Sequence, residues 1–452
     1  MHDASTTFSA SSPDATVLRT SASGSYTNPI QYYLLCKKIK HIEINKPSLN
    51  VSKLQPMYDD LAQWFSRSDV VIKSKTTSFK DGKSFVHIPS EIQTHIHSLT
   101  NRVQYEFDTS CLRASTPSGG RNIKLCIVSD GIQQEHSEII SLVHSWLCFL
   151  EQHVRPVCSK TLTIYLYLTD CTKKLPQVVE GQRPIELSQN NVNSGFTAAC
   201  NLNNEIYIFR REEWFKVLLH ESIHAMGVDF SWYNNQKPIE SILQKEFTGV
   251  QITQWNITEC YTEIWAEIIN VLIQVFIITK KKSFNHVKQI IYTALYYESC
   301  WSHIQCSKIL QYYGITYQEL ISNKVVYQET ETSVFSYYVL KCLLMCNIGL
   351  FIDWCGCGIR SRAEDNHAYS EGRRRSPDEY EIHRFSKKND AVDLFSHIFD
   401  DETVIQKNMI SFGKFLVQLS RDNQHSQQLN KIQHMNIDLG DSLRMSLWSD
   451  GY

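Results

Sequence analysis

The chain has 452 residues, of which 42% are hydrophobic and 20% charged, and this balance excludes disorder along its whole length. Its formal net charge of −2 excludes the strongly basic class that binds polyanions, so no nucleic-acid partner is expected. The length suits two to four ordinary domains, or one large catalytic domain with an N-terminal module.

The first 30 residues are polar and rich in Ser and Thr, which predicts a disordered tail. They lack the basic and apolar regions of a secretory signal. Residues 31–124 are expected to form an N-terminal α/β module. Its predicted elements are a helix at 54–66 and short strands at 84–88 and 123–128.

Residues 125–350 contain the strongest predicted elements. Periodicity and composition indicate a helix at 133–154, a strand at 161–168, and two short strands at 195–200 and 205–209. The apolar period then becomes helical, with Glu212 and Glu213 favouring a helix start and Gly227 its end.

Further helices are expected at 257–279, 284–297, 334–352 and 391–419. Residues 358–390 mix charges of both signs around an Arg-Arg-Arg-Ser-Pro run, which predicts a mobile polar loop. Residues 391–452 would form a C-terminal helical segment and tail. The most apolar stretches, at 268–279 and 337–354, are interpreted as buried helices because one is too short for a membrane span and the other contains Lys341.

The chain contains 14 cysteines without paired CxxC spacing, the closest two being Cys355 and Cys357. In a chain without a secretory signal this pattern predicts reduced thiols. The protein is therefore expected to be cytoplasmic and not secreted, with no membrane partner.

Residues 220–224 read His-Glu-Ser-Ile-His within a helical stretch. Two histidines four residues apart share one helix face, so His220 and His224 can bind a single ion. Glu221 between them is placed to contact water on that ion. In such a site zinc lowers the pKa of its water to about 7, and the glutamate takes the proton as hydroxide attacks a carbonyl. The structural alternative is a pair of helix histidines with ordinary hydrogen-bond partners.

A catalytic zinc site needs a third protein ligand. The spacing HExxHxxGxxH would supply a histidine at position 230, but Phe230 stands there. Asp229 could reach the ion only if the turn differs. The better source is the following helix, where Glu259, Glu263 and Glu267 recur every four residues. Carboxylates stacked on one face of a buried helix need a compensating partner, and a zinc ion with its histidines is one.

Two assignments of these glutamates remain open. In the preferred one, Glu259 is the ligand and Glu263 accepts the free ring N–H of a ligating histidine. In the other, Asn256 and Glu259 form a capping box, Glu263 is the ligand and Glu267 supports it.

An HExxH helix followed by a glutamate helix resembles the gluzincin arrangement, in which a ligand glutamate is followed four positions later by an acidic residue. Glu259 and Glu263 match that pair, although Thr258 replaces the usual asparagine and the gap after His224 is longer than typical. The stretches EEWFKVLLHESIHAMGVDFS, TECYTEIWAE and TSVFSYYVLK resemble a family of uncharacterised zincin-like proteins of large DNA viruses. The likeness covers about residues 125–350 and brings no substrate with it.

The resemblance implies an α+β fold with a zincin-like core, a small twisted sheet, two site helices and a mostly helical C-terminal half. It also points to the FSYY stretch for the group that stabilises an oxyanion, with Tyr338 slightly favoured over Tyr337. The alternative for either tyrosine is a place in the core. A strand at 195–199 could be the sheet edge that pairs with an extended peptide, or an ordinary short strand.

The sequence thus predicts a Zn²⁺-dependent hydrolase, a metallopeptidase with Glu221 as general base and Tyr338 as a catalytic group. His220, His224 and Glu259 would bind the metal. The substrate would be a peptide or protein, and a viral origin would place the chain in the host cytoplasm or virion. The alternatives are a non-enzymatic viral structural or scaffold protein that retains a zinc site, and a metal-dependent hydrolase or deaminase of non-peptide amides.

Overall fold

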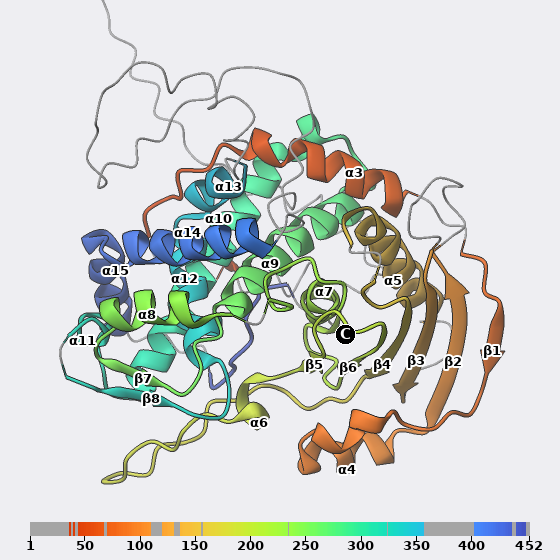
Figure 1. The fold of residues 1–452 in the computed structure, drawn as a ribbon, viewed down its shortest axis with the longest axis horizontal. Helices are drawn as coiled ribbons and strands as arrows, with labels where there is room; N and C mark the ends of the chain where they lie inside the picture. The colour runs from red at the N-terminus through yellow and green to blue at the C-terminus, as the bar shows by residue number, and fades with distance from the viewer. Residues whose placement is uncertain are drawn as a thin grey trace, which may run out of the picture.

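The computed structural model describes residues 36–37, 39–40, 44–66, 70–109, 120–130, 136–154, 157–233, 235–322, 324–356, 402–435 and 440–448. The tail predicted at 1–30 and the polar loop predicted at 358–390 lie outside these residues. The described part combines helices with a small mixed sheet, and Figure 1 shows the sheet at one side of the molecule and most helices at the other.

The main sheet has six strands in the order β1-β2-β3-β4-β6-β5. Its central strands β3, β4 and β6 are parallel, whereas β2 and β5 pair antiparallel with their neighbours. A separate parallel pair is formed by β7 and β8. The bounds are β1 Ser74–Thr76, β2 Asn101–Asp108, β3 Asn122–Ser129, β4 Thr161–Tyr167, β5 Gly195–Thr197, β6 Asn203–Ile208, β7 Val250–Ile252 and β8 Tyr327–Glu329.

Both faces of the sheet are covered. Side chains alternate along each strand, so each strand contributes apolar residues to a cluster on either face. In β3, Leu125 and Ile127 face the main core, while Cys126 and Val128 face a smaller apolar cluster. Helix α5 (His136–Leu150) contributes to the main core, and α4 (Ser90–Ser98) with η2 (Lys83–His87) contributes to the smaller cluster. The sheet is thus a rigid platform with its edge strand β5 left at one border.

The remaining helices pack mainly around α9 (Ile257–Ile278), whose residues are almost all buried. They are η1 Val51–Leu54, α3 Gln55–Phe65, η5 Glu151–His153, α6 Gln189–Val192, α7 Trp214–Ala225, α8 Lys237–Glu246, α10 Phe284–Tyr312, α11 Tyr317–Leu320, η6 Phe335–Leu340, α12 Lys341–Cys346, α13 Ile348–Gly356, α14 Glu402–Ser420 and α15 Asn423–Gln433. Among the described residues, α9 alone is a single helix long and apolar enough to cross a membrane, and 94% of that window is buried inside the molecule. A bent pair, Phe335–Cys346 with Ile348–Gly356, passes the same test.

Two predicted elements are wrong in kind or shape. The strand expected at 84–88 is the 3-10 helix η2, which buries Phe85 against the sheet. The single helix expected at 334–352 begins as the π-helix η6 and bends by 85° between α12 and α13. The bend follows Asn347, whose backbone is not helical, and Gly349 then packs so closely on the Ser48 carbonyl that a Cβ would lie 1.7 Å from it.

Other predictions hold with shifted ends. The helices expected at 54–66, 133–154 and 257–279 are α3, α5 and α9, and the strands expected at 123–128 and 161–168 are β3 and β4. The helix expected at 284–297 continues to Tyr312 as α10, and α14 covers the described part of the helix expected at 391–419. The domain boundary expected near residue 125 falls inside β3, and the division into domains stays a prediction.

One pair of cysteines departs from the expectation of reduced thiols. Cys158 and Cys200 form a disulfide with their Cα atoms 4.4 Å apart. The bond joins the segment before β4 to the turn between β5 and β6. Gly227 lies against it, since a Cβ there would come within 2.8 Å of Cys158 Sγ. No sequence pattern pairs these residues, because they are 42 positions apart and meet only in the folded chain.

Candidate metal centre

Helix α7 carries the HExxH residues and is held at its start by a buried ion pair. Glu213 precedes the helix in the left-handed conformation, with φ 61° and no solvent exposure. Its carboxylate lies 2.5 Å from Lys173 Nζ and accepts a hydrogen bond from Ser446 N. Burial would raise the pKa of Glu213, but Lys173 and Lys216 outweigh it and hold the pKa below its ordinary value.

The end of α7 is closed just after His224. Gly227 adopts φ 67°, as expected for the residue that ends this helix, and its N–H donates to the His224 carbonyl. The same carbonyl accepts from Cys200 N at 3.2 Å, and Ser159 Oγ donates to the next carbonyl, of Ala225. These bonds satisfy the last carbonyls of the helix and fix the backbone of His224.

Three side chains converge from α7 and α9. His220 Nε2 lies 3.1 Å from His224 Nε2, and Glu259 Oε2 lies 3.0 Å from the first nitrogen and 3.2 Å from the second. For zinc bound tetrahedrally at about 2.0–2.1 Å by N and O ligands, the ligand atoms would be about 3.3 Å apart. His220, His224 and Glu259 therefore form a group that could hold a metal ion.

The other ring nitrogens of both histidines face carboxylates. His220 Nδ1 lies 2.9 Å from Glu263 Oε2, and His224 Nδ1 hydrogen-bonds with Asp229 Oδ2. A proton on each Nδ1 leaves a lone pair on each Nε2. Two such lone pairs and the Glu259 oxygen then point at one another, which is repulsive unless a cation lies between them. The donor set fits a divalent metal ion.

The electrostatics of the group also favour a cation. Burial alone would lower the pKa of His220, but the carboxylates of Glu259 and Glu263 raise it to about 9. The pKa of His224 is likewise raised well above its ordinary value, because Asp229 and Glu259 outweigh burial. Both imidazoles therefore lie in a field that stabilises positive charge.

The structure brings Glu259, and not Glu263, to the two Nε2 atoms. Asn256 Nδ2 donates to Glu259 Oε1 at 3.0 Å, which turns the other oxygen toward the histidines. The capping box considered for Asn256 does not form, because its side chain makes no hydrogen bond to the α9 backbone. Its Oδ1 instead accepts from Thr258 Oγ1.

Glu263 lies one turn further along α9, between His220 and Lys216. Its Oε1 forms an ion pair with Lys216 Nζ, and both side chains are almost fully buried. Burial would raise the pKa of Glu263, but Lys216 and His220 hold it well below its ordinary value. Glu267 is directed elsewhere, with Oε2 3.1 Å from Lys341 Nζ. It has no part in the metal centre.

Glu221 lies beside the three converging side chains and is 7% exposed. Burial is the main reason why its pKa is raised to about 7, while the two site histidines act in the opposite direction. The edge strand β5 packs directly on it. A Cβ at Gly195 would lie 3.2 Å from Glu221 Cγ and 2.8 Å from Val217 Cγ1, so glycine allows the strand to approach the helix this closely.

The two tyrosines of the FSYY stretch lie differently. Tyr338, the one favoured from the sequence, is buried, and its hydroxyl donates to the Leu443 carbonyl at 2.7 Å. Tyr337 is the tyrosine beside the centre, with its ring centroid 6.2 Å from that of His220. Burial, then Glu259 and Glu221, raise the pKa of Tyr337 well above its ordinary value. The π-helical turn of η6 sets which of the two side chains faces α7, and sequence spacing based on an α-helix could not show this.

The sequence does not predict the contacts of two neighbours of the centre, Asp229 and Lys216. Asp229, which the sequence offers only as a possible ligand, is the acceptor that orients His224, and it accepts a hydrogen bond from Thr262 Oγ1 at 2.9 Å. Its only sequence signal is its position just after the Gly227 turn. Lys216, one turn before His220, has the stronger signal, since a lysine within an apolar helix needs a buried partner.

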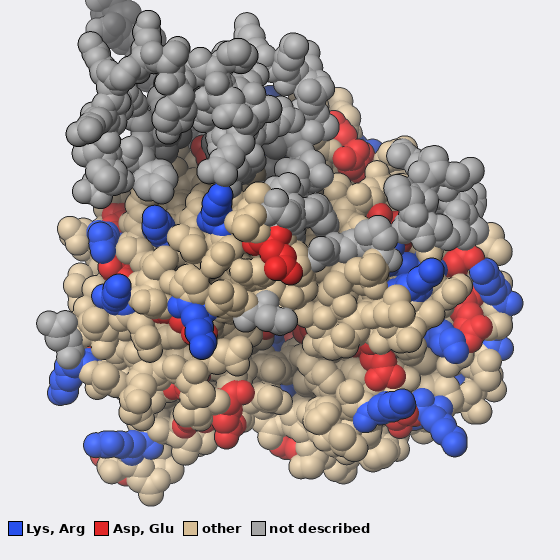
Figure 2. Space-filling view, in the orientation of Figure 1, with Lys and Arg blue, Asp and Glu red and all other residues tan. Residues whose placement is uncertain are grey.

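One face of the molecule is hollowed near its middle. Figure 2 shows a recess near the middle of the drawn face, close to where β5 lies in Figure 1. On that face the described Lys and Arg side chains are interspersed with Asp and Glu. The described residues of the drawn face therefore form no broad basic stripe.

Comparison of the chain with protein-family models, with curated proteins and with solved structures finds no match.

Proposed function

We propose that this chain is a zinc-dependent hydrolase with a zincin-like core, and that it cleaves peptide bonds. The observation that supports this most is the convergence of His220 Nε2, His224 Nε2 and Glu259 Oε2 beside the carboxylate of Glu221. A purely structural zinc site would have a fourth protein ligand, whereas a catalytic one keeps a position open. Within the described residues the group has three members.

Zinc is the metal that fits best, because two imidazoles and one carboxylate are a donor set common to catalytic zinc sites. When bound, zinc would supply Lewis acidity and lower the pKa of a water molecule. His220, His224 and Glu259 hold the ion in this proposal, and Glu263 and Asp229 orient the two imidazoles. Glu221 accepts the proton of the attacking water and passes it to the leaving group.

A peptide substrate is favoured by the edge strand next to the centre. Among the residues that the structure describes, strand β5 pairs on one side only, with β6, and Gly195 at its start packs on Glu221. An extended peptide can pair with such an edge through its backbone. The peptide bond to be cleaved would then lie beside α7. The hydroxyl of Tyr337 would donate a hydrogen bond to the oxyanion that develops on its carbonyl oxygen.

The test compares wild-type protein with Glu221→Gln in a peptide-library cleavage assay, with zinc measured in each preparation. We expect cleavage by the wild type that a chelator abolishes. In Glu221→Gln we expect full zinc content and a rate about 10²–10⁴-fold lower, the usual contribution of a general base. Glu240→Gln on α8 is the matched control and should leave the rate unchanged.

Unchanged turnover in Glu221→Gln would disprove the role of this residue. A wild-type protein that binds zinc and cleaves neither peptides nor small amides would instead be a structural or scaffold protein. Cleavage of small amides but not peptides would leave the metal chemistry in place and change the substrate class.

A further inference from the structure

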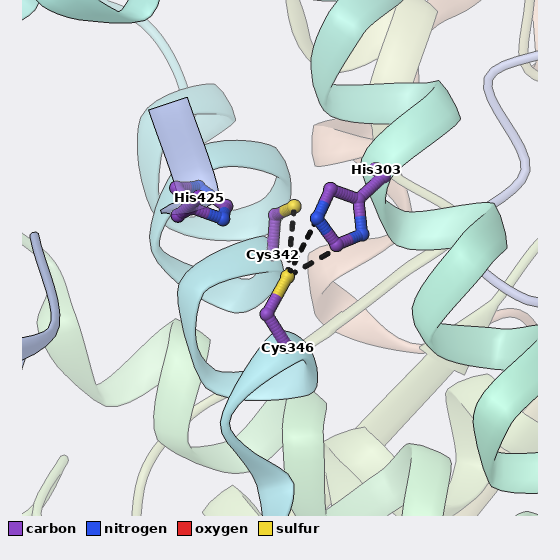
Figure 3. A group of neighbouring side chains, drawn as sticks. All are labelled: His303, Cys342, Cys346 and His425. Carbon is purple, nitrogen blue, oxygen red and sulfur yellow. Dashed lines mark hydrogen bonds between the residues drawn. The ribbon is translucent and has the colours of Figure 1, made fainter. Parts of the chain in front are cut away.

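We propose that His303, Cys342, Cys346 and His425 bind a second zinc ion, which has a structural role. One potential ligand atom from each of these residues lies within 4.8 Å of all the others. Figure 3 shows the four side chains turned toward a common point from three helices. We call this group the Cys2His2 cluster; it shares no residue with the site on α7 and α9.

The distances suit tetrahedral coordination. Cys342 and Cys346 are one helical turn apart on α12, and their sulfurs are separated by 3.8 Å. Zinc bound to two sulfurs at about 2.3 Å in a tetrahedron separates them by about 3.8 Å. Cys346 Sγ lies 3.1 Å from His303 Nε2, a few tenths of an ångström closer than the about 3.6 Å expected between sulfur and nitrogen ligands.

Both histidines have ring nitrogens close to the cysteines. His303 Nδ1 lies 3.0 Å from the Ser299 carbonyl, which places a proton on Nδ1 and leaves Nε2 as the nitrogen that could bind a metal. Cys346 Sγ lies 3.4 Å from Nδ1 as well as 3.1 Å from Nε2, and Gln428 also hydrogen-bonds to this imidazole, so the ring must turn for Nε2 to coordinate an ion. His425 is 2% exposed, and neither of its ring nitrogens has a hydrogen-bond partner among the described residues. A buried imidazole with two unsatisfied nitrogens is costly, and metal coordination satisfies one of them.

The aromatic packing holds the His425 ring in place. Its centroid lies 4.9 Å from that of Tyr317 in an edge-on arrangement and 5.4 Å from that of His303. His425 therefore sits beside the other three residues although it comes from α15, far along the chain. With two cysteines and two histidines, three of them buried and Cys346 partly buried, the group has the composition of a closed structural zinc site.

The cluster would join α15 to α10 and α12. Helix α12 follows η6 directly, and η6 carries Tyr337. The second ion would thus stabilise the helix that continues into the candidate catalytic centre. The alternative is a disulfide involving the neighbouring thiol of Cys306, which lies next to Cys342.

The first experiment counts zinc in protein purified under reducing conditions without chelator. We expect two ions per chain in the wild type and one in the double variant Cys342→Ser with Cys346→Ser. The matched control is Cys355→Ser, which removes a buried cysteine outside the cluster and should keep two ions. Two ions in the Cys342 and Cys346 double variant would overturn the proposal.

Since the cysteine variant can fail to fold, X-ray absorption at the zinc edge is measured on the wild type and on His220→Ala with His224→Ala. In the second protein we expect one zinc per chain with two sulfur ligands at about 2.3 Å. The proposal would be overturned if zinc in the wild type were surrounded only by nitrogen and oxygen. It would also be overturned by a Cys306–Cys342 disulfide in protein purified with zinc under reducing conditions. One sulfur-ligated zinc in the wild type would support this site and contradict the proposed catalytic one.

Discussion

At the residue scale, the two glutamates of α9 have separate tasks that one turn of helix divides. Glu259 faces both Nε2 atoms, whereas Glu263 faces His220 Nδ1 and Lys216. Asn256 decides this arrangement by holding the other oxygen of Glu259. The candidate ligand Glu259 and the candidate supporting carboxylate Glu263 are therefore distinguished by what their second oxygens contact.

This division predicts different metal affinities for two variants. Glu259→Ala removes one of the three candidate ligands and should abolish zinc binding at this centre, while a zinc ion at the Cys2His2 cluster would remain. Glu263→Gln removes the charge that orients His220 and should weaken zinc binding about 10–100-fold. Dissociation constants from chelator competition at one pH measure both effects. The control is Glu246→Gln, which changes a buried carboxylate at the end of α8 that is paired with Arg421. A larger loss in Glu263→Gln than in Glu259→Ala would exchange the two roles.

The two adjacent tyrosines provide a second matched pair. Tyr337→Phe should keep its zinc and lower kcat about 10²–10³-fold, because an oxyanion donor is lost. Tyr338→Phe should keep kcat and lower the free energy of unfolding by about 1–3 kcal/mol, because the buried Leu443 carbonyl loses its donor. Steady-state kinetics and denaturant unfolding separate the two effects. Equal kcat in the wild type and Tyr337→Phe would remove this tyrosine from the mechanism.

At the element scale, the closeness of β5 to α7 depends on the absence of a side chain at one position. Gly195 lies where a Cβ would be 2.8 Å from the Tyr207 carbonyl oxygen and 3.2 Å from Glu221 Cγ. Backbone oxygen cannot move aside as a flexible side chain can. A larger residue must therefore separate the strand from the helix and displace Glu221.

We expect Gly195→Ala to lower the free energy of unfolding by about 1–3 kcal/mol and also to lower kcat/KM. Gly314→Ala is the control, because Gly314 has φ 66° and open space around its Cα, so alanine there adds backbone strain of about 1–2 kcal/mol away from the centre. Activity and unfolding are measured for both. If both variants lose stability equally and neither loses activity, the strand does not position Glu221.

At the scale of the whole molecule, the disulfide joins the segment before β4 to the turn between β5 and β6, next to the end of α7. Cys200 is bonded to Cys158, and its N–H donates to the His224 carbonyl. A crosslink over 42 positions stabilises the native state by about 4 kcal/mol through the entropy of the unfolded chain. Disulfides persist in oxidising environments and are rare in the cytosol, whereas the sequence predicts a cytoplasmic location. The location of the protein stays a prediction.

Reduction of the wild type should lower its free energy of unfolding by about 4 kcal/mol. The double variant Cys158→Ser with Cys200→Ser should be less stable by a similar amount and insensitive to the reductant. Denaturant unfolding with and without reductant measures both. The bond is not formed if the wild-type protein is equally stable under the two conditions and both thiols react with an alkylating reagent. The expectation of reduced thiols would then hold for these two cysteines.

Local patterns were sufficient for much of the fold. Strands β3 and β4 and helices α5 and α9 follow from apolar periodicity, since each buries a continuous stripe or face. The strand expected at 84–88 was wrong because five residues cannot distinguish an edge strand from a 3-10 turn. The bend after α12 escaped prediction because it depends on contact between Gly349 and the distant Ser48 backbone.

The sequence by itself determined the helix of the candidate metal centre, because His220 and His224 are one helical turn apart and share a face without any distant contact, and Glu221 is adjacent to His220 in the sequence. It also narrowed the third ligand to two glutamates on α9. Only the tertiary structure placed Glu259 beside both Nε2 atoms, turned Tyr337 toward the centre, and paired Asp229 with His224. It alone brought His303, Cys342, Cys346 and His425 together, because helix packing, and not spacing along the chain, sets which residues of α10, α12 and α15 meet.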